Sequence, residues 1–216
     1  MTTLRLPVPG RLPTTLRQHL AALRALLILT VLLGIVYPLV VLAIGQLAFP
    51  AQANGSLLSV DGRVVGSSLL GQAFADAKGT PLPQWFQPRP SAASDPNNKN
   101  DPGYNPLFSG GSNLGPSNPV LIKSIDARRA AVAAFDGVPP ASVPPDALTA
   151  SGSGLDPDIS PAYAEEQITR VAKARGVDPA TVRALVAAHI QGRTLGILGE
   201  PRVNVLELNA ALTRLP

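Results

Sequence analysis

The sequence predicts an α+β protein: a single transmembrane helix near the N-terminus, then one domain of short strands and about four helices. Three features predict this arrangement. They are an uncharged apolar stretch, a series of helix-start signals in the C-terminal half, and a long Pro/Asn/Gly-rich segment before them. A length of 216 residues suits one ordinary domain with such an extra element.

The apolar stretch covers residues 25–49, and no charged residue occurs from Ala25 to Val60. As a helix, its 25 residues would span about 37 Å, enough to cross a hydrocarbon layer of about 30 Å. Pro38 removes one helical hydrogen bond, so we expect a kink there. Residues 51–53 (AQA) would suit a signal peptidase, but the apolar core of a signal peptide has only about 7–15 residues. An uncleaved anchor is therefore the preferred interpretation.

The basic residues predict the orientation in the membrane. Four of the 18 Lys and Arg residues precede the first acidic residue, Asp61, which leaves 14 basic and 14 acidic residues from position 25 onward. These four are Arg5, Arg11, Arg17 and Arg24. Because basic flanks stay in the cytoplasm, we expect a basic cytoplasmic tail (1–24), a transmembrane helix (25–49) and an extracytoplasmic domain (50–216). A neutral domain has no basic surface for nucleic acid, so that partner is excluded.

The domain is expected to open with a β-hairpin, because residues 57–60 and 63–65 flank Asp61-Gly62, a pair typical of a type I′ turn. Residues 76–117 follow as a long loop with eight prolines. The loop holds four of the nine aromatic residues: Trp85, Phe86, Tyr104 and Phe108. Since disordered linkers are poor in aromatic residues, we expect this loop to be packed or to form a contact surface.

Four helices are predicted after the loop. Asn118, Ser160 and Asp178 each stand before a proline, as an N-cap residue before the first helical position. Asn204 with Glu207 resembles a capping box. The first three helices are expected to end near Phe135, Gly176 and Gly192, with an extended connector over residues 139–145.

No complete catalytic or metal-binding set is recognisable. The chain has no Cys and only two His, which excludes thiolate zinc sites and His-rich metal sites. Residues 149–158 lack the lysine of a phosphate-binding loop. Ser151 or Ser153 as a nucleophile would need His189 as its base. Neither serine stands in a Gly-x-Ser-x-Gly nucleophile elbow or in a Ser-x-x-Lys box. The carboxylate pairs 156/158 and 165/166 are expected to be solvated charges, so the domain is predicted to be non-enzymatic.

Five strings, in order, resemble the C subunit of the Kdp potassium-transporting ATPase, a bacterial high-affinity potassium pump. They are GSSLLGQAF (66–74), WFQPRPSA (85–92), YNPLFSGGSNLGPSNP (104–119), TASGSGLDPDISPAYAEEQITRVAKARG (149–176) and LGEPRVNVLELNAAL (198–212). The resemblance covers nearly the whole chain from the apolar helix onward. It implies an accessory, non-catalytic subunit of the cell membrane, needed for assembly and activity. Its implied partners are an ATP-hydrolysing and a potassium-binding subunit.

The resemblance also implies a catalytic chaperone that raises the ATP affinity of the ATPase subunit, with a glutamine in nucleotide contact. By its place in the string AEEQITRVAKARG, that glutamine is Gln167. ATP is cytoplasmic, however, and the charge pattern places Gln167 outside. We therefore expect an indirect effect on ATP affinity, Gln167 as a packing or exposed helix residue, and no firmly bound cofactor, with ATP held only through the partner subunit.

An outward-facing domain could cap the external mouth of the potassium-conducting subunit. The candidate contact residues are Arg89, Tyr104, Asn105, Ser109, Gly110, Gly111 and Asn113. The competing interpretation is that their hydrogen bonds tie the loop down internally. Two other functions stay open from the residues alone: a signal-anchored extracytoplasmic serine hydrolase, and a cleaved binding protein that begins near Asn54.

Overall fold

The computed structural model describes residues 13–215, and the chain divides into two units, one ending at Asn54 and the other beginning at Gly55. Arg5 and Arg11, half of the predicted basic cluster, lie outside the described residues. The expected α+β composition is confirmed, because helices and short strands both occur in the second unit.

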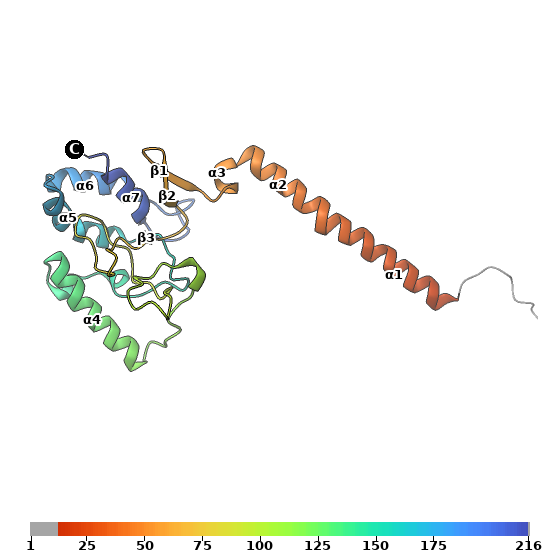
Figure 1. Cartoon of the computed structure of the whole chain (residues 1–216), viewed down its shortest axis with the longest axis horizontal. Coiled ribbons are helices and arrows are strands. Elements are labelled where there is room, and N and C mark those ends of the chain that lie inside the picture. Colours follow the sequence, from red (N-terminus) through yellow and green to blue (C-terminus); the bar gives the residue numbers. More distant parts are fainter. Residues whose placement is uncertain (1–12, 216) are drawn as a thin grey trace, which may run out of the picture. The chain divides into compact units, whose positions relative to one another are not determined.

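The first unit is dominated by one long apolar helix (Figure 1). Helix α1 (Thr14–Val31) continues through a π-helical turn, η1 (Leu32–Val36), into α2 (Tyr37–Ala48). Together they cover 35 residues, and among the described residues this is the one helix long and apolar enough to cross a membrane. It begins at Thr14, so Arg17 and Arg24 are helical residues.

The π-helical turn explains how the helix passes Pro38. A proline cannot donate to the carbonyl four residues earlier, here that of Gly34, and its ring clashes with that carbonyl. Gly34 lies inside η1, where the wider π geometry absorbs the mismatch and α2 continues. Where the sequence predicts a kink, the structure has this π-helical turn just before Pro38. A short helix, α3 (Pro50–Ala53), ends the unit, and the Asn54 amide donates to Gln46 Oε1 at 3.0 Å.

The second unit opens with the predicted hairpin. Strands β1 (Leu57–Val60) and β2 (Arg63–Ser67) are antiparallel. The two turn residues, Asp61 and Gly62, have φ angles of +51° and +76°, as a type I′ turn requires. The hairpin prediction is thus confirmed at both strands and at the turn.

Four helices follow, each starting where the sequence predicts. They are α4 (Pro119–Asp136), α5 (Pro161–Arg175), α6 (Pro179–Ala188) and α7 (Val205–Leu212). In each case the N-cap side chain accepts a hydrogen bond from a backbone N–H two or three residues ahead. The connector between α4 and α5 is not extended: its prolines begin two 3-10 turns, η3 (Pro140–Ser142) and η4 (Pro145–Ala147).

A small antiparallel sheet joins the C-terminal helices, in the order β3 (Asp158–Ile159), β5 (Arg202–Asn204), β4 (Ile190–Gln191). The expected helix end near Gly192 is therefore wrong. Helix α6 stops at Ala188, because Ile190 and Gln191 pair with Val203 and Arg202 of β5. Strands of two or three residues are too short for an alternating pattern, so tertiary pairing decides them.

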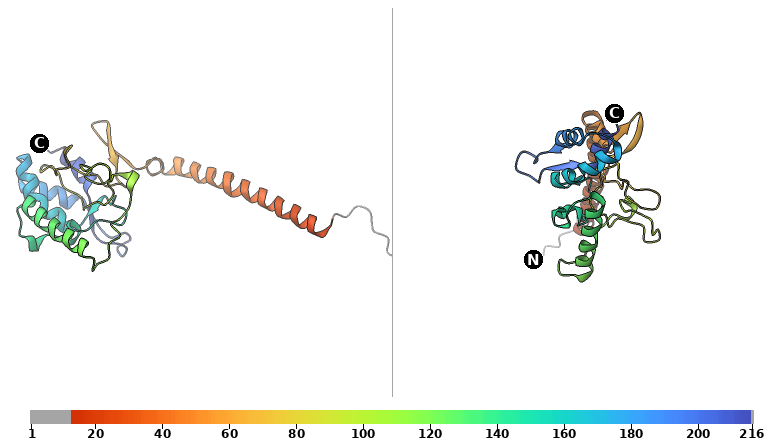
Figure 2. Two further views of the ribbon diagram at one scale, coloured as in Figure 1. Left: turned by 60° about the horizontal axis from the view of Figure 1, so that its bottom comes forward. Right: turned by 90° about the vertical axis from the view of Figure 1, so that its left-hand side faces the viewer.

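The core of this unit is built around α5, which contacts α4 and α6, while α7 packs against α6 (Figures 1 and 2). Its fully buried apolar residues on the helices include Ile168, Val171, Val182, Leu208 and Leu212. The long loop also contributes to the core, since Phe86 is completely buried. The expectation that the 76–117 loop packs is thereby supported at its most apolar point.

Candidate functional site

The loop of residues 76–117 is held in the core by a reciprocal clamp at Phe86. The Phe86 N–H donates to Asn209 Oδ1 at 2.9 Å, and the Asn209 amide donates back to the Phe86 carbonyl at 3.0 Å. Asn209 lies on α7 and is itself buried. Because both backbone groups of Phe86 are satisfied this way, the phenyl ring can be buried without orphaned polar atoms.

Gln167 lies next to this clamp and forms a second one. Its side chain is fully buried, and Oε1 accepts from the Gln87 N–H at 2.6 Å. Its amide nitrogen donates to the Gln87 carbonyl at 3.1 Å, and Oε1 also accepts from Arg170 at 2.6 Å. The structure therefore places Gln167 in the core, as a packing residue that fixes the loop backbone.

Arg170 is the centre of this buried polar cluster. Its Nε donates to the Asp136 carboxylate at 2.5 Å, and its Nη1 donates to the carbonyls of Pro83 and Trp85 at 2.6 and 2.9 Å. The guanidinium also stacks over the Phe135 ring, 4.4 Å from its centroid. Burial raises the pKa of Asp136, and the charge of Arg170 opposes that rise. One side chain thus ties α4, α5 and the loop together.

Sequence reasoning missed this buried polar cluster. Arg170 lies three residues after Gln167, on a helix whose buried face also carries Ile168 and Val171. A cation on a buried helical face needs an anionic or hydrogen-bonding partner. The position of Arg170 on this face could therefore have predicted a buried polar cluster. The partner itself, Asp136, lies 34 residues away and is brought near only by the packing of α4 on α5.

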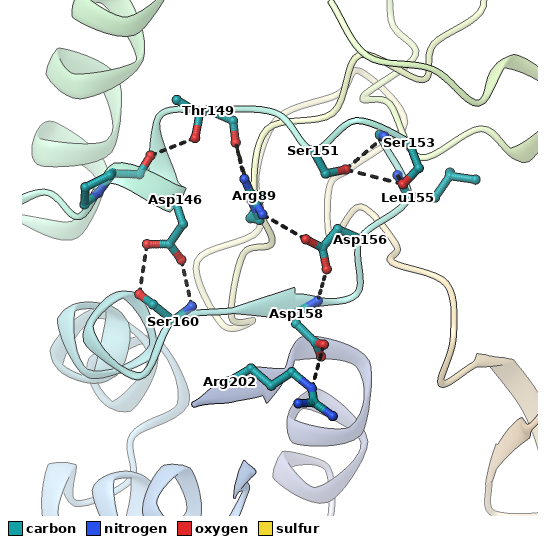
Figure 3. A network of polar contacts seen from close by, with 12 residues as sticks. Arg89, Asp146, Thr149, Ser151, Ser153, Leu155, Asp156, Asp158, Ser160 and Arg202 are labelled. Carbon is teal, nitrogen blue, oxygen red and sulfur yellow. Dashed lines mark hydrogen bonds and ion pairs between the residues drawn. The ribbon is translucent and has the colours of Figure 1, made fainter. Parts of the chain in front are cut away.

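Two predicted contact residues, Arg89 and Tyr104, support each other. Arg89 Nη1 bonds Asp156 at 2.8 Å, and its Nε and Nη2 reach the Thr149 carbonyl at 3.4 and 3.3 Å (Figure 3). The Tyr104 hydroxyl donates to the Arg89 carbonyl at 2.9 Å, and burial raises the pKa of this phenol. A Cβ at Gly71 would lie 2.2 Å from the Tyr104 ring, so this close approach requires glycine.

The other predicted contact residues divide into internal and exposed positions. Asn105 Oδ1 accepts from the Leu107 N–H at 3.1 Å, which starts the 3-10 turn η2 (Pro106–Phe108). The Ser109 hydroxyl and the Gly110 N–H both donate to the Ser153 carbonyl, and Gly111 approaches the backbone of Gly152. Asn113 is exposed, with a φ of +53°. The loop thus has the internal hydrogen bonds that the competing interpretation predicts. Of these five residues, only Ser109 and Asn113 are exposed to solvent.

The serines of residues 149–158 hold a turn. Ser151 and Ser153 accept from the N–H groups of Gly154 and Leu155 at 2.9 and 3.1 Å (Figure 3). His189 Nδ1 contacts the Leu185 carbonyl of its own helix at 2.8 Å. Within the described part of the chain, neither serine hydroxyl bonds to His189 or to a lysine. The arrangement lacks the hydrogen-bonded pair that a serine nucleophile uses.

The sequence predicts that both carboxylate pairs are solvated charges, and this prediction is wrong for three of the four residues. Asp156 is paired with Arg89, and Asp158 with Arg202 at 3.1 Å (Figure 3). Glu165 is exposed and paired with Arg183, but Glu166 Oε1 is buried without a hydrogen-bond partner among the described residues. Burial, together with the charges of Asp136 and Asp146, raises the pKa of Glu166 to about 7. The reason for the error is that α5 turns Glu166 toward the packed side of the helix.

Replacing Glu166 with Gln should make the domain more stable at pH 8. A carboxyl whose pKa is raised on folding from 4.5 to about 7 favours the folded state when protonated. That contribution is lost as the pH rises from about 4.5 through 7. Because Glu166 is partly exposed, we expect a gain of roughly 1 kcal/mol at pH 8 for Glu166→Gln, and no gain at pH 4.

The measurement is the free energy of unfolding between pH 4 and 8, compared with Glu165→Gln. Glu165 lies next to Glu166 on the same helix but is exposed. If the free energy of unfolding depended on pH equally in the Glu166→Gln variant and the wild type, Glu166 would not be the group that causes this dependence.

An exposed apolar surface lies where the hairpin approaches the loop. Leu69 and Leu107 are 63% and 86% exposed. Leu70 and Pro106 line one hollow of about 170 Å³, together with Ser67, the strand partner of Leu57. We call Leu57, Leu69, Leu70, Leu107 and Phe108 the apolar patch: Leu70 lines this hollow, and each of the others is the strand partner of a lining residue or lies within two residues of one. Contiguous exposed apolar side chains are typical of interaction surfaces.

Comparison with known proteins gives the family. The family model of the K+-transporting ATPase, c chain, matches residues 19–214. The chain belongs to this family. It is similar to the potassium-transporting ATPase KdpC subunit of Kineococcus radiotolerans, with 56% identity over 93% of this chain and 95% of the relative. The KdpC subunits of Sorangium cellulosum (56% identity, 88% and 94% coverage) and Streptomyces coelicolor (49%, 92% and 93%) are also similar.

The family assignment confirms the resemblance seen in the five strings. The chain is a subunit of a potassium-transporting ATPase complex and takes part in potassium transport. The apolar helix agrees with a single-pass membrane protein, and membership of the complex implies partner subunits.

Proposed function

We propose that this chain is a non-catalytic accessory subunit that holds the potassium-transporting ATPase together from outside the cytoplasm. The apolar patch is the observation that carries the proposal. Leu69 and Leu107 expose most of their surface to water, although neither is needed for the core. Covering such side chains is favourable by about 25 cal/mol per Å², so a partner surface would stabilise them.

The patch lies close in sequence to the apolar helix. Leu57 follows Ala48, the last residue of α2, by nine residues, which span at most about 30 Å. A partner that contacts Leu57 would therefore lie within reach of the end of the membrane helix. A membrane-embedded subunit of the same complex, such as the potassium-binding subunit, fits this requirement. Ser109 and Asn113, which are exposed in the loop that carries Leu107 and Phe108, are further candidate contacts.

The flanking charges support an outward-facing domain. Arg17 and Arg24 lie in the N-terminal part of the apolar helix, and no charged residue occurs from Ala25 to Val60. The excess of arginine on one flank is the pattern that keeps this flank in the cytoplasm. In this orientation Gly55–Pro216 is extracytoplasmic.

Under this proposal the subunit raises ATP affinity only indirectly. Gln167 is buried, and its amide oxygen accepts both the Gln87 N–H and Arg170. Contact with a nucleotide would require breaking this cluster. We therefore infer that nucleotide affinity changes through the partner subunit, as a coupling free energy between distant surfaces.

A cysteine at Asn98 tests the orientation, because the chain has no native Cys and Asn98 is exposed. Intact cells, with any outer membrane permeabilised, are treated with a maleimide that cannot cross the inner membrane. We expect labelling of Asn98→Cys, and no labelling of a control with the cysteine at Thr15 until the cells are lysed. Protection of Asn98→Cys that ends on lysis would place the domain in the cytoplasm and overturn the proposal.

A further inference from the structure

We propose that a cleft between the loop and α4 binds an anionic amphiphile, a molecule with a short aliphatic chain and one carboxylate or phosphate group. This loop cleft has a volume of about 390 Å³, within the range of about 300–1,000 Å³ of small-molecule sites. The proposal is independent of the docking role of the apolar patch, because Leu57, Leu69, Leu70, Leu107 and Phe108 do not line the cleft.

The walls of the loop cleft are suited to an aliphatic chain. Prolines of the loop form one side, among them Pro81 and Pro88, and Val132 and Phe135 of α4 form the other. The amide of Gln87 also lines the cleft, but it is committed to the carbonyls of Phe74 and Leu82, both at 3.0 Å. The hydroxyls of Ser91 and Tyr104, which also line the cleft, donate to backbone carbonyls as well. Few polar groups are thus left to recognise a base or a sugar, which disfavours a nucleotide.

The charge at the cleft is supplied by Arg128. It donates one hydrogen bond, to the Leu148 carbonyl at 3.0 Å, and has no carboxylate partner among the described residues. Arg89, the other cation of the lining, is neutralised by Asp156. None of the lining residues is acidic. A cation without a counter-ion beside apolar walls is complementary to one anionic group on an apolar body.

The structure also indicates how such a ligand would lie. Arg128 belongs to α4, seven residues before Phe135, so the two lie two turns apart on one side of the helix. The anionic group would bond to the free N–H groups of Arg128, and the aliphatic chain would extend along α4 toward Phe135. Burial of the chain between the prolines and α4 would provide the apolar part of the affinity.

Photolabelling of the full chain tests the proposal. The chain is reconstituted in nanodiscs of phosphatidylcholine, and the probe is a decanoic acid with a diazirine on its chain. We expect labelled residues on α4 and on the loop segments that line the cleft. Unlabelled decanoate should compete, whereas the uncharged decanol should not. Labelling confined to the apolar helix, or equal competition by decanol, would overturn the proposal, as would displacement by ATP at the same concentration.

Two pairs of variants make the test specific. Arg128→Gln should reduce labelling of the cleft about tenfold, the loss expected for one charge-assisted contact. Arg129→Gln is its matched control, because Arg129 is adjacent but is paired with Asp126. Ala131→Phe should block the cleft, and Ala130→Phe should not, since Ala131 lines the cleft and Ala130 does not. Equal labelling within both pairs would contradict the assignment of the site.

A second arm identifies the source of the amphiphile. The nanodiscs then carry phosphatidylglycerol with a diazirine in its acyl chain. Labelling of the cleft by this lipid would show that a membrane lipid supplies the chain and the anionic group. Labelling by the decanoate probe alone would show a soluble amphiphile. Absence of cleft labelling in both arms would exclude the site.

Discussion

Replacing Arg170 with Met should lower the free energy of unfolding of the domain by about 3–5 kcal/mol. The substitution leaves the Asp136 carboxylate buried without its cation, since the two side chains are only 6% and 1% exposed. It also leaves the Pro83 carbonyl without its donor, and the Trp85 carbonyl keeps only the 3.4 Å bond from the Gln87 amide. A loss of this size is comparable to the whole stability of many domains, so we expect a largely unfolded chain at physiological temperature.

The fluorescence of Trp85 can follow this unfolding, because it is the only Trp in the chain and its carbonyl is bonded to Arg170. Arg183→Met is the matched control: it removes an exposed pair with Glu165, and we expect a loss below about 1 kcal/mol. The double variant Arg170→Met, Asp136→Leu should recover part of the loss, because no buried charge remains unpaired. Equal unfolding midpoints for Arg170→Met and Arg183→Met would contradict the central role of the cluster.

The same cluster affects how substitutions at Gln167 should be interpreted. A change of this residue removes the hydrogen bonds to both backbone groups of Gln87 and one bond to Arg170. Loss of these bonds would loosen the loop and the domain before any effect on nucleotide could be measured. A reduced ATP affinity in such a variant therefore needs a stability control, because misfolding of the accessory subunit would give the same result.

The elements that the sequence predicts well are those fixed by local chemistry. Asn118, Ser160, Asp178 and Asn204 all cap helices, because the capping side chain bonds only two or three residues ahead. The Asp61-Gly62 turn is predicted for the same reason, as its φ values depend on these two residues. Strand β4 is missed because its pairing with β5 is set by packing and not by its own two residues.

The candidate site shows the same limit at longer range. Arg89 and Tyr104 were predicted as contact residues because they stand in recognisable strings, yet their polar groups are bonded to Asp156, Thr149 and each other. Gln167 reaches Gln87 across 80 residues of chain, a pairing that no local pattern encodes. Sequence strings therefore identify the family and the segment, whereas the direction of each side chain depends on the packed loop.

Changing Leu69 and Leu107 together to Asp should release the subunit from its partners. Both side chains are exposed in the apolar patch, so the domain itself should fold normally. If each leucine contributes about 2 kcal/mol to docking, the double variant loses about 4 kcal/mol, close to a thousandfold in affinity. The measurement is co-purification of the subunit with an affinity-tagged partner subunit in mild detergent, together with potassium-dependent growth.

Leu195 provides the matched control for this docking surface. It is 86% exposed, like Leu107, but lies in the turn between β4 and β5, which does not line the hollow beside the patch. We expect Leu195→Asp to co-purify normally. Release by Leu195→Asp, with retention of the Leu69→Asp, Leu107→Asp variant, would move the docking surface to that turn. All three positions are exposed, so we expect the unfolding midpoints of both variants to match that of the wild type. Matching midpoints would exclude loss of folding as the cause of either outcome.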